Sequence, residues 1–216
     1  MRKSETSKDL AAVVFIVDDD LSMRDALTDL FMSMNFDVEA FETPAAFLER
    51  AAGDRHGCIP LDVRLPGLNG LDFQTHLDRV GNQMPIVFMT GFGDVPMSVR
   101  AMKAGAIDFL IKPFKDQDML DAVAVALERD RQRRRRSAEI KAVKERFDAL
   151  TPRERETMLA VAKGLMNKQI AHQLGISEVT VKLHRGSVMR KLNVRSVADL
   201  VRMVEFLNDD PISPAP

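Results

Sequence analysis

The stretch that decides the fold is Val13-Val14-Phe15-Ile16-Val17-Asp18-Asp19-Asp20, five apolar residues followed at once by three carboxylates. Such a run is typical of a strand buried on both faces of a parallel sheet, where side chains cannot alternate between core and water. Strands alternating with helices favour a doubly wound α/β domain with a five-stranded parallel sheet. The predicted strands are Val13–Val17, Val38–Phe41, Cys58–Val63, Ile86–Met89 and Asp108–Ile111.

Helix-start signals support this alternation. Ser22 is the expected N-cap of the first helix, and Thr43-Pro44 places a cap before a proline that suits the first helical position. Further helical patterns lie near Gly70–Val80, Val95–Ala104 and Asp116–Leu127.

Composition excludes several classes of protein. With 216 residues, 45% hydrophobic and 29% charged, the chain is not disordered throughout, and its one cysteine, Cys58, fits a cytoplasmic protein without disulfides. The longest apolar run, Leu10–Val17, is far shorter than the roughly 20 residues of a membrane span. Residues 1–128 hold 12 Lys and Arg against 21 Asp and Glu, whereas residues 129–216 hold 19 against 11. This division predicts two domains, with nucleic acid as a partner of the basic one.

Polar side chains gather where the predicted strands end. Asp18 and Asp19 follow the first strand, and Asp62 lies near the end of the third. Thr90 ends the fourth strand, and Lys112 follows the fifth. The carboxyl ends of parallel strands meet at one edge, so we expect these groups to lie together. Carboxylates suit Mg²⁺, a carboxylate can attack phosphorus, and a hydroxyl and an ammonium can hold phosphoryl oxygens. A solvated acidic loop explains any one of them, but their joint placement favours a phosphoryl site.

Four segments resemble the receiver domain of two-component response regulators: Ile16–Asp20, Leu61–Gly67, Met89–Gly91 and Ile111–Phe114. The resemblance spans about residues 12–127. It implies that a histidine kinase phosphorylates Asp62 and that the Lys112–Pro113 peptide bond is cis. The implied Mg²⁺ ligands are Asp18, Asp19, Asp62 and the backbone carbonyl of Arg64. The implied switch and phosphoryl contacts are Thr90, Phe109, Lys112 and Pro113.

One residue departs from the receiver pattern. Pro60 lies inside the predicted third strand, where receivers usually carry an aliphatic residue. Proline removes a ladder donor and is normally confined to edge strands or bulges. A tolerated bulge is the favoured interpretation, and a distorted strand that alters Asp62 is the alternative.

Residues 128–147 are predicted to form a basic helical linker. Arg129 to Arg136 contains six arginines and no apolar residue, after which Ile140, Val143, Phe147 and Leu150 recur at the spacing of an a/d seam. A helix that packs on the second domain and a short coil that pairs two chains are equally open interpretations. The chain ends, residues 1–11 and 209–216, are predicted to be disordered.

Residues 148–208 contain helical patterns only. Thr151-Pro152-Arg153-Glu154 reads as a capping box, Gly175 suits the left-handed end of a short helix, and Ser177 suits the N-cap of the next. A short helix, a glycine turn and a capped helix predict a helix-turn-helix inside an all-α four-helix domain. The core face of the second of these helices is expected to carry Val181, Val188 and Leu192.

Three segments of this domain, Leu150–Glu154, Gly164–Ala171 and Thr180–His184, resemble the LuxR-type helix-turn-helix. The whole chain resembles FixJ-like response regulators, above all those that control aromatic-compound catabolism. This implies a homodimer on phosphorylation, binding to double-stranded promoter DNA, and contact with RNA polymerase. The expected DNA-binding residues are Asn167, Lys168, Thr180, Lys182, Leu183, Arg185 and Arg190. The last helix is expected to pair two chains through Val197, Leu200, Val201 and Val204, although this stripe is also a candidate for intradomain core.

An enzyme is the competing interpretation. Asp18-Asp19-Asp20 has the Asp-x-Asp spacing that dehalogenase-type phosphatases place after their first strand. A Mg²⁺-dependent phosphohydrolase would then use Asp18, not Asp62, as its nucleophile. The attached helix-turn-helix and the lack of a substrate-cap insertion argue against it. A scaffold with an inactive receiver is a third interpretation, but every switch position is filled. The sequence therefore predicts a transcription regulator, more often an activator in this family, and not an enzyme.

Overall fold

The computed structural model describes residues 12–50, 55–91 and 95–208. The chain divides into two compact units, Met1–Arg134 and Arg135–Pro216, and each is described here by itself. The helix α5 (Asp116–Asp148) contains both the pattern expected at Asp116–Leu127 and the linker expected after it. The termini predicted to be disordered, 1–11 and 209–216, lie outside the described residues.

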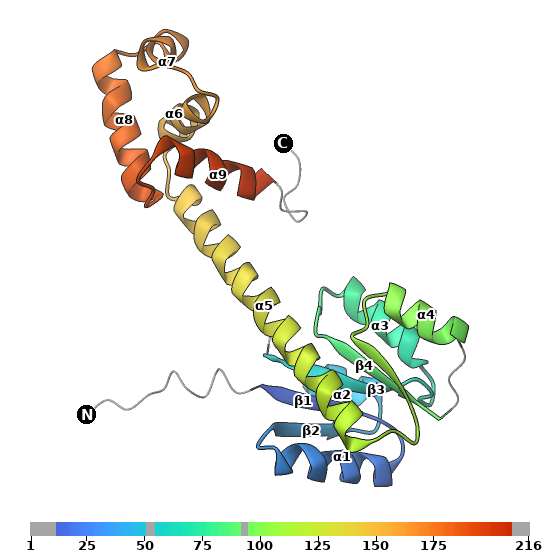
Figure 1. The fold of residues 1–216 in the computed structure, drawn as a ribbon. Coiled ribbons are helices and arrows are strands. Elements are labelled where there is room, and N and C mark those ends of the chain that lie inside the picture. The colour runs from blue at the N-terminus through green and yellow to red at the C-terminus, as the bar shows by residue number, and fades with distance from the viewer. Residues whose placement is uncertain (1–11, 51–54, 92–94, 209–216) are drawn as a thin grey trace, which may run out of the picture. The chain divides into compact units, whose positions relative to one another are not determined.

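The first unit contains a five-stranded parallel sheet in the order β2-β1-β3-β4-β5, which confirms the predicted fold class (Figure 1). The central strands are buried throughout, whereas the outer two are partly exposed. In this order the connections change direction beside β1, so ligands are expected at the carboxyl ends of β1 and β3. The strands are β1 (Val13–Val17), β2 (Asp37–Phe41), β3 (Gly57–Asp62), β4 (Ile86–Thr90) and β5 (Asp108–Ile111).

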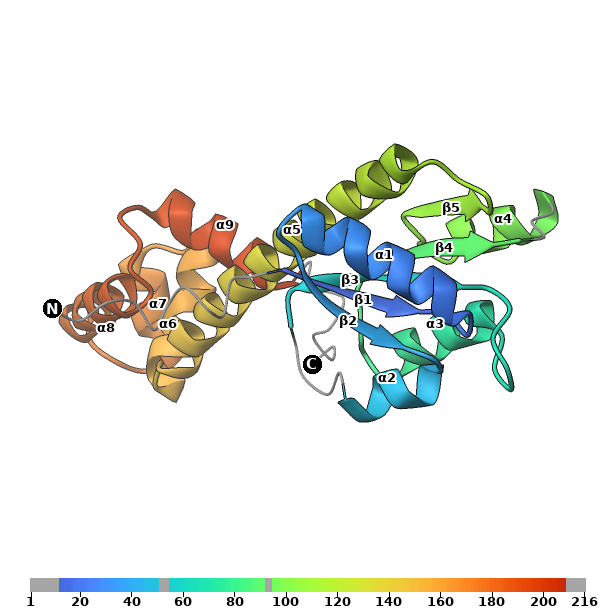
Figure 2. The same ribbon diagram turned by 90° about the horizontal axis from the view of Figure 1, so that it is seen from below.

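Helices cover both faces of the sheet. α1 (Leu21–Ser33) and α5 pack on one face, and α2 (Pro44–Arg50), α3 (Gly70–Arg79) and α4 (Val95–Lys103) cover the other (Figure 2). Aromatic rings fill the second layer, where the ring of Phe47 lies 5.7 Å from that of Phe15 and 5.8 Å from that of Phe73. The two apolar cores, one on each face of the sheet, fix the positions of the strand ends and therefore of the acidic edge.

The N-cap of α1 is Asp20, so the expectation that Ser22 would be the cap is wrong. The side chain of Asp20 accepts a hydrogen bond of 2.9 Å from the backbone N–H of Ser22, and the helix begins at Leu21. Aspartate caps as well as serine does, and the earlier residue starts the helix directly after the strand. Asp20 is thereby assigned to the helix and not to the acidic cluster.

Pro60 lies in a regular strand, and the expected bulge is absent. The pairs Val14–Cys58 and Val17–Leu61 of β1 and β3 keep the same offset, so no residue is inserted between them. On the other side, pairing with β4 is continuous from Ile59 to Asp62. The missing N–H of Pro60 leaves a gap in the ladder with β1 without displacing the strand.

The second unit consists of the end of α5 and four helices, α6 (Pro152–Ala162), α7 (Asn167–Leu174), α8 (Glu178–Lys191) and α9 (Val197–Asn208). The predicted capping signals are present: Thr151 and Glu154 form a capping box, and Ser177 caps α8. Gly175 ends α7 in the left-handed region with a φ of 66°. Leu150 belongs to the core of this unit and Phe147 packs against it, so the end of the linker seam serves the second domain.

Candidate functional site

The carboxyl edge of the sheet brings Asp18, Asp19 and Asp62 together. One carboxylate oxygen from each lies within 4.8 Å of the others, although Asp18 and Asp19 follow β1 and Asp62 ends β3, more than 40 positions later. Asp18 and Asp62 are buried, whereas Asp19 is exposed. Three hard oxygen donors with an open side are a donor set that fits Mg²⁺.

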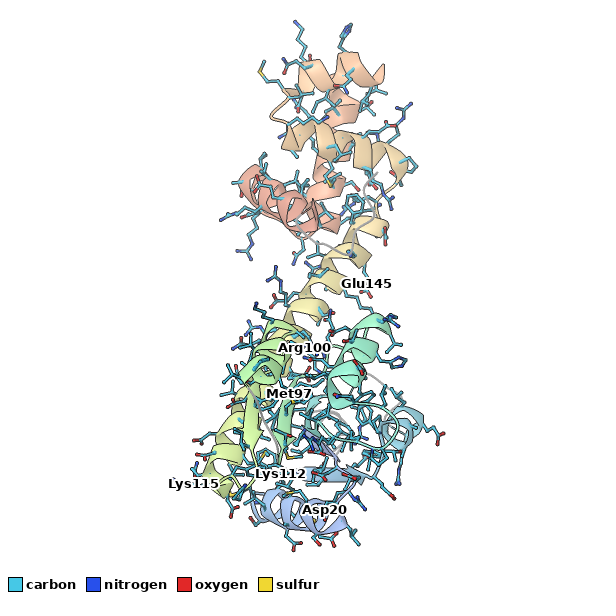
Figure 3. The ribbon with its side chains drawn as sticks, turned by 90° about the vertical axis from the view of Figure 1, so that its right-hand side faces the viewer. Asp20, Met97, Arg100, Lys112, Lys115 and Glu145 are labelled. Atoms are coloured by element: carbon cyan, nitrogen blue, oxygen red, sulfur yellow. The ribbon has the colours of Figure 1, made fainter. Side chains whose placement is uncertain are left out.

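Lys112 connects the two buried carboxylates. Its Nζ lies 2.6 Å from Asp18 Oδ2 and 3.3 Å from Asp62 Oδ1. The backbone N–H of Lys112 donates to the carbonyl of Thr90 over 2.7 Å, and the Lys112–Pro113 bond is cis, as expected. Figure 3 shows Lys112 and Asp20 at the same end of the first unit. One ammonium thus faces two buried carboxylates, which leaves this edge with an excess of negative charge.

Burial is the main cause of the raised pKa of Asp62. Lys112 opposes this effect, and the neighbouring charge of Asp18 adds to it. For Lys112, burial alone would lower the pKa, but the hydrogen bond and charge of Asp18, together with Asp62, raise it. The cluster therefore keeps its ammonium charged and makes the charge of Asp62 costly, which favours a group or ion that neutralises that carboxylate.

Backbone groups hold the carboxylates in position. The N–H of Arg64 donates to Asp62 Oδ2 over 3.2 Å, and the N–H of Asp20 donates to Asp18 Oδ1 over 3.0 Å. A Cβ on Gly70, at the start of α3, would lie 2.5 Å from the carbonyl oxygen of Asp62, so only glycine fits there. Arg24 was missed by sequence reasoning: its Nη1 donates to the carbonyl of Asp18 over 2.7 Å, although its place in α1 looks like that of any polar helix residue.

The predicted switch residues come from β4, β5 and the segment that follows β5. Thr90 is buried at the end of β4. Phe109 is half-buried on β5, and its ring centroid lies 6.2 Å from that of Phe88. Pro113 follows the cis bond and is exposed. Their switch roles, like the role of the Arg64 carbonyl, stay predictions.

Helix α8 of the second unit presents two different faces. Val181, Val188 and Leu192 are in the core, as predicted. Leu183 is 70% exposed on the other side, and Lys182 and Arg190 are also exposed. An exposed leucine between cations fits contact with base edges in a major groove, which admits a helix.

The other expected DNA-binding residues lie at the start of α7, in the first turn of α8 (Thr180) and near the middle of α8 (Arg185). Arg185 Nη1 donates to Asn167 Oδ1 over 2.6 Å, which joins the two helices. Lys168 is exposed, and the Thr180 hydroxyl lies 2.8 Å from that of Ser177.

The dimerisation stripe predicted on α9 needs a correction. Leu200 is 1% exposed and lies in the core, and Val204 packs against that core, so these side chains stabilise their own domain. Val197 is exposed and Val201 is half-buried, which leaves these two as candidates for contact with a second chain. A stripe at helical spacing cannot by itself separate a core from an interface.

An acidic sheet edge that can accept a phosphoryl group, in the same chain as a helix-turn-helix unit, defines the class of phosphorylation-controlled DNA-binding proteins. Within the described residues, no helix is both long enough and apolar enough to span a membrane.

Comparison with known proteins agrees with this class. The Response regulator receiver domain matches residues 14–124, and the family of Bacterial regulatory proteins, luxR family, matches residues 148–204. Nodulation protein W of Bradyrhizobium diazoefficiens is 53% identical over 202 residues, which are 94% of this chain and 89% of that protein. The structure of response regulator StyR is 48% identical with a TM-score of 0.83, over 90% of this chain and 98% of that one. Full-length FixJ from B. japonicum is 37% identical with a TM-score of 0.56, over 91% and 97%.

The chain therefore belongs to the FixJ-like response regulators of two-component systems. It is a transcription regulator with a receiver and a LuxR-type DNA-binding domain.

Proposed function

We propose that Asp62 accepts a phosphoryl group from a sensor histidine kinase and that this promotes dimerisation on promoter DNA. The observation that carries the proposal is the position of the Asp62 carboxylate, 3.3 Å from Lys112 Nζ and within reach of Asp18 and Asp19. An Asp62 oxygen attacks phosphorus while the P–N bond of phosphohistidine breaks, and the imidazole leaves with the electron pair.

Asp18, Asp19, Asp62 and the Arg64 carbonyl would hold Mg²⁺, which neutralises phosphoryl oxygens when bound. Lys112 would release Asp62 and contact a phosphoryl oxygen instead. Thr90 would move toward the new group, and Phe109 would turn inward to fill the space that Thr90 leaves. Pro113, which follows Lys112, completes the proposed set of switch and phosphoryl contacts. These movements would reshape the α4–β5 face of the receiver.

In the second domain, Lys182, Leu183 and Arg190 would face the major groove of double-stranded DNA, with Asn167, Lys168, Thr180 and Arg185 beside them. Two domains paired through Val197 and Val201 would read half-sites about one helical turn apart. RNA polymerase would be recruited to a promoter in the cytoplasm, with activation the more usual outcome. The proposed domains are 12–127, 128–147 and 148–208.

Phosphosite mapping tests the proposal. The chain is treated with acetyl phosphate and Mg²⁺, and the modified residue is found by mass spectrometry. We expect the label on Asp62 alone, no label in Asp62→Asn, and loss of the Mg²⁺ dependence in Asp19→Asn. A label on Asp18 would instead support the phosphohydrolase, although Asp18 is fully buried and bonded to Lys112.

A further inference from the structure

The arginine of α8 that binds Asn167 has a different position from the other expected DNA-binding residues. Arg185 lies four residues after Val181 and three before Val188, so at helical spacing it shares the side of these two core residues. It is half-buried, whereas Lys182 and Leu183 are exposed. Its guanidinium therefore emerges along the α7 side of α8 and not from the middle of the outward face.

The partner of Arg185 carries no charge. Asn167 Oδ1 accepts from Arg185 Nη1 over 2.6 Å, which fixes the guanidinium but does not neutralise it. Several other cations of this unit are bonded to carboxylates: Lys191 to Glu154, Arg155 to Asp148, and Arg153 to Glu156. Among the described residues, the side-chain bond that the structure gives for Arg185 is this one to an amide, and no carboxylate is bonded to it.

A guanidinium has five N–H donors in a rigid fork, and the bond to Asn167 uses one of them. The remaining donors and the full positive charge stay available in a fixed position between two helices. A cation that is ordered before binding loses less entropy when it contacts a ligand. Phosphate oxygens at the rim of a groove suit such a group, because contacts to phosphate set the position of a protein on DNA without reading its sequence.

We infer that Asn167 and Arg185 form one phosphate-binding pair, in which Asn167 is a positioning residue for Arg185 and neither reads a base. This inference rests on the proposed DNA contacts of α8. Selection between base pairs then belongs to the outward side chains, Lys182 and Leu183. By binding a phosphate of the DNA backbone, the pair fixes the position of α8 along the duplex.

The test uses the phosphorylated full-length chain and two duplexes: a preferred sequence selected from a random library, and a scrambled sequence of the same composition. Binding is measured at several salt concentrations. Arg185→Ala should weaken binding to both duplexes by the same factor, roughly tenfold or more, and should reduce the salt slope by about one per phosphate contact. Lys182→Ala should change the ratio between the two duplexes.

Asn167→Asp is the decisive variant, because it keeps the shape of the side chain and adds a carboxylate beside Arg185. It should reproduce the smaller salt slope of Arg185→Ala although Arg185 is present. Asn167→Ala should reduce the affinity for DNA less than Asn167→Asp does. In a chain that already carries Arg185→Ala, Asn167→Ala should cause no further loss of affinity. Arg185→Lys should restore the salt slope, and Arg153→Ala is the control for loss of a charge that is already paired.

Two outcomes would overturn the inference: wild-type binding by Asn167→Asp, or a change in the preferred base pairs caused by Arg185→Ala or Arg185→Lys. If Arg185→Ala fails to fold, Asn167→Asp and Arg185→Lys still decide. A wild-type chain that binds neither duplex would contradict the proposed DNA contacts themselves, and is thereby distinguished from failure of this inference alone.

Discussion

At the scale of single residues, Lys112 contacts two carboxylates, Asp18 and Asp62, that would also bind a divalent cation. Its ammonium lies 2.6 Å from Asp18 and 3.3 Å from Asp62, so it balances part of the negative charge of the edge. Without it the two buried carboxylates would repel each other, and the fold would lose stability unless another cation bound.

Lys112→Met should therefore strengthen Mg²⁺ binding by roughly tenfold, which corresponds to about 1.4 kcal/mol, and should destabilise the protein in the absence of Mg²⁺. Isothermal titration calorimetry at low salt measures the affinity. Lys115→Met is the control, because Lys115 is exposed and close in sequence. Weaker Mg²⁺ binding in Lys112→Met would show that the lysine supports the cation instead of competing with it.

Sequence reasoning brought Asp18, Asp62, Thr90 and Lys112 to one edge because parallel strands end together. It did not predict which groups bond there. The Lys112–Asp18 pair joins residues 94 positions apart, and packing of the whole sheet sets its geometry. The Asn167–Arg185 bond was missed for the same reason, since both residues were assigned to DNA separately.

At the scale of elements, a buried carboxylate adds to the apolar packing that holds α5 on the sheet. Asp130 Oδ2 lies 2.8 Å from His56 Nδ1 and accepts from the N–H of Gly57 over 3.1 Å, and Arg133 and Arg134 bind the same carboxylate. Burial alone would raise the pKa of Asp130, but the bonds from His56 and the two arginines lower it. Sequence reasoning did not find this contact, because an acid within an arginine run looks like a surface residue.

Asp130→Asn should destabilise the first unit by about 3 kcal/mol, because the two arginines and His56 lose a buried charged partner. Urea unfolding followed through NMR signals of β3 measures the loss. Glu128→Gln, which removes an exposed carboxylate bonded to Arg131, is the matched control and should have little effect. Equal effects of the two substitutions would contradict the assigned role of Asp130.

Glu154 joins α6 to α8 in the second unit. It is buried, and it accepts from Ser187 over 2.6 Å, from Lys191 over 2.7 Å and from the N–H of Thr151 over 2.7 Å. The hydrogen bond from Lys191, followed by that from Ser187, lowers the pKa of Glu154 from 4.5 to about 2. The capping box was predicted from sequence, but the bonds to α8 depend on the tertiary fold.

Glu154→Gln should lower the stability of the second unit by about 1–2 kcal/mol at neutral pH. Because the folded pKa lies below the ordinary value, the charge stabilises the fold fully above about pH 4.5 and ceases to do so as the pH falls toward 2. The difference from wild type should therefore shrink in acid, which urea unfolding followed through α8 signals can measure. A difference that is independent of pH would mean that the loss of an accepting oxygen, and not the loss of charge, is what destabilises the variant. Glu156→Gln is the exposed control.

At the scale of the whole molecule, the sequence predicted the two folds because each leaves a strong periodic signal: continuous apolar strands in one half, capped helices in the other. It could not separate core from interface on α9, because Leu200 and Val197 follow the same spacing. The charge division, 12 cations against 21 acids in residues 1–128 and 19 against 11 in residues 129–216, also has two meanings. The opposite charges can allow the acidic receiver to inhibit the basic DNA-binding domain, or the basic charge can serve only to attract DNA.

The two interpretations predict different DNA affinities for the isolated second unit, which has its own core. If the receiver inhibits DNA binding, residues 135–216 should bind DNA more tightly than the unphosphorylated full chain. The difference in affinity between the two forms should become smaller at high salt. Fluorescence anisotropy with a labelled operator duplex measures both. If the isolated unit is the weakest binder of all forms, the receiver acts only by bringing two chains together.

The central claim is that phosphorylation of Asp62 controls DNA binding, and operator affinity tests it most directly. The full-length chain and Asp62→Asn are each titrated against the same duplex, with and without acetyl phosphate and Mg²⁺. We predict that acetyl phosphate tightens binding by the wild-type chain and steepens its concentration dependence, while Asp62→Asn keeps the basal affinity and does not respond. A response of Asp62→Asn equal to that of wild type, or full phosphorylation of Asp62 without a change in affinity, would contradict the account.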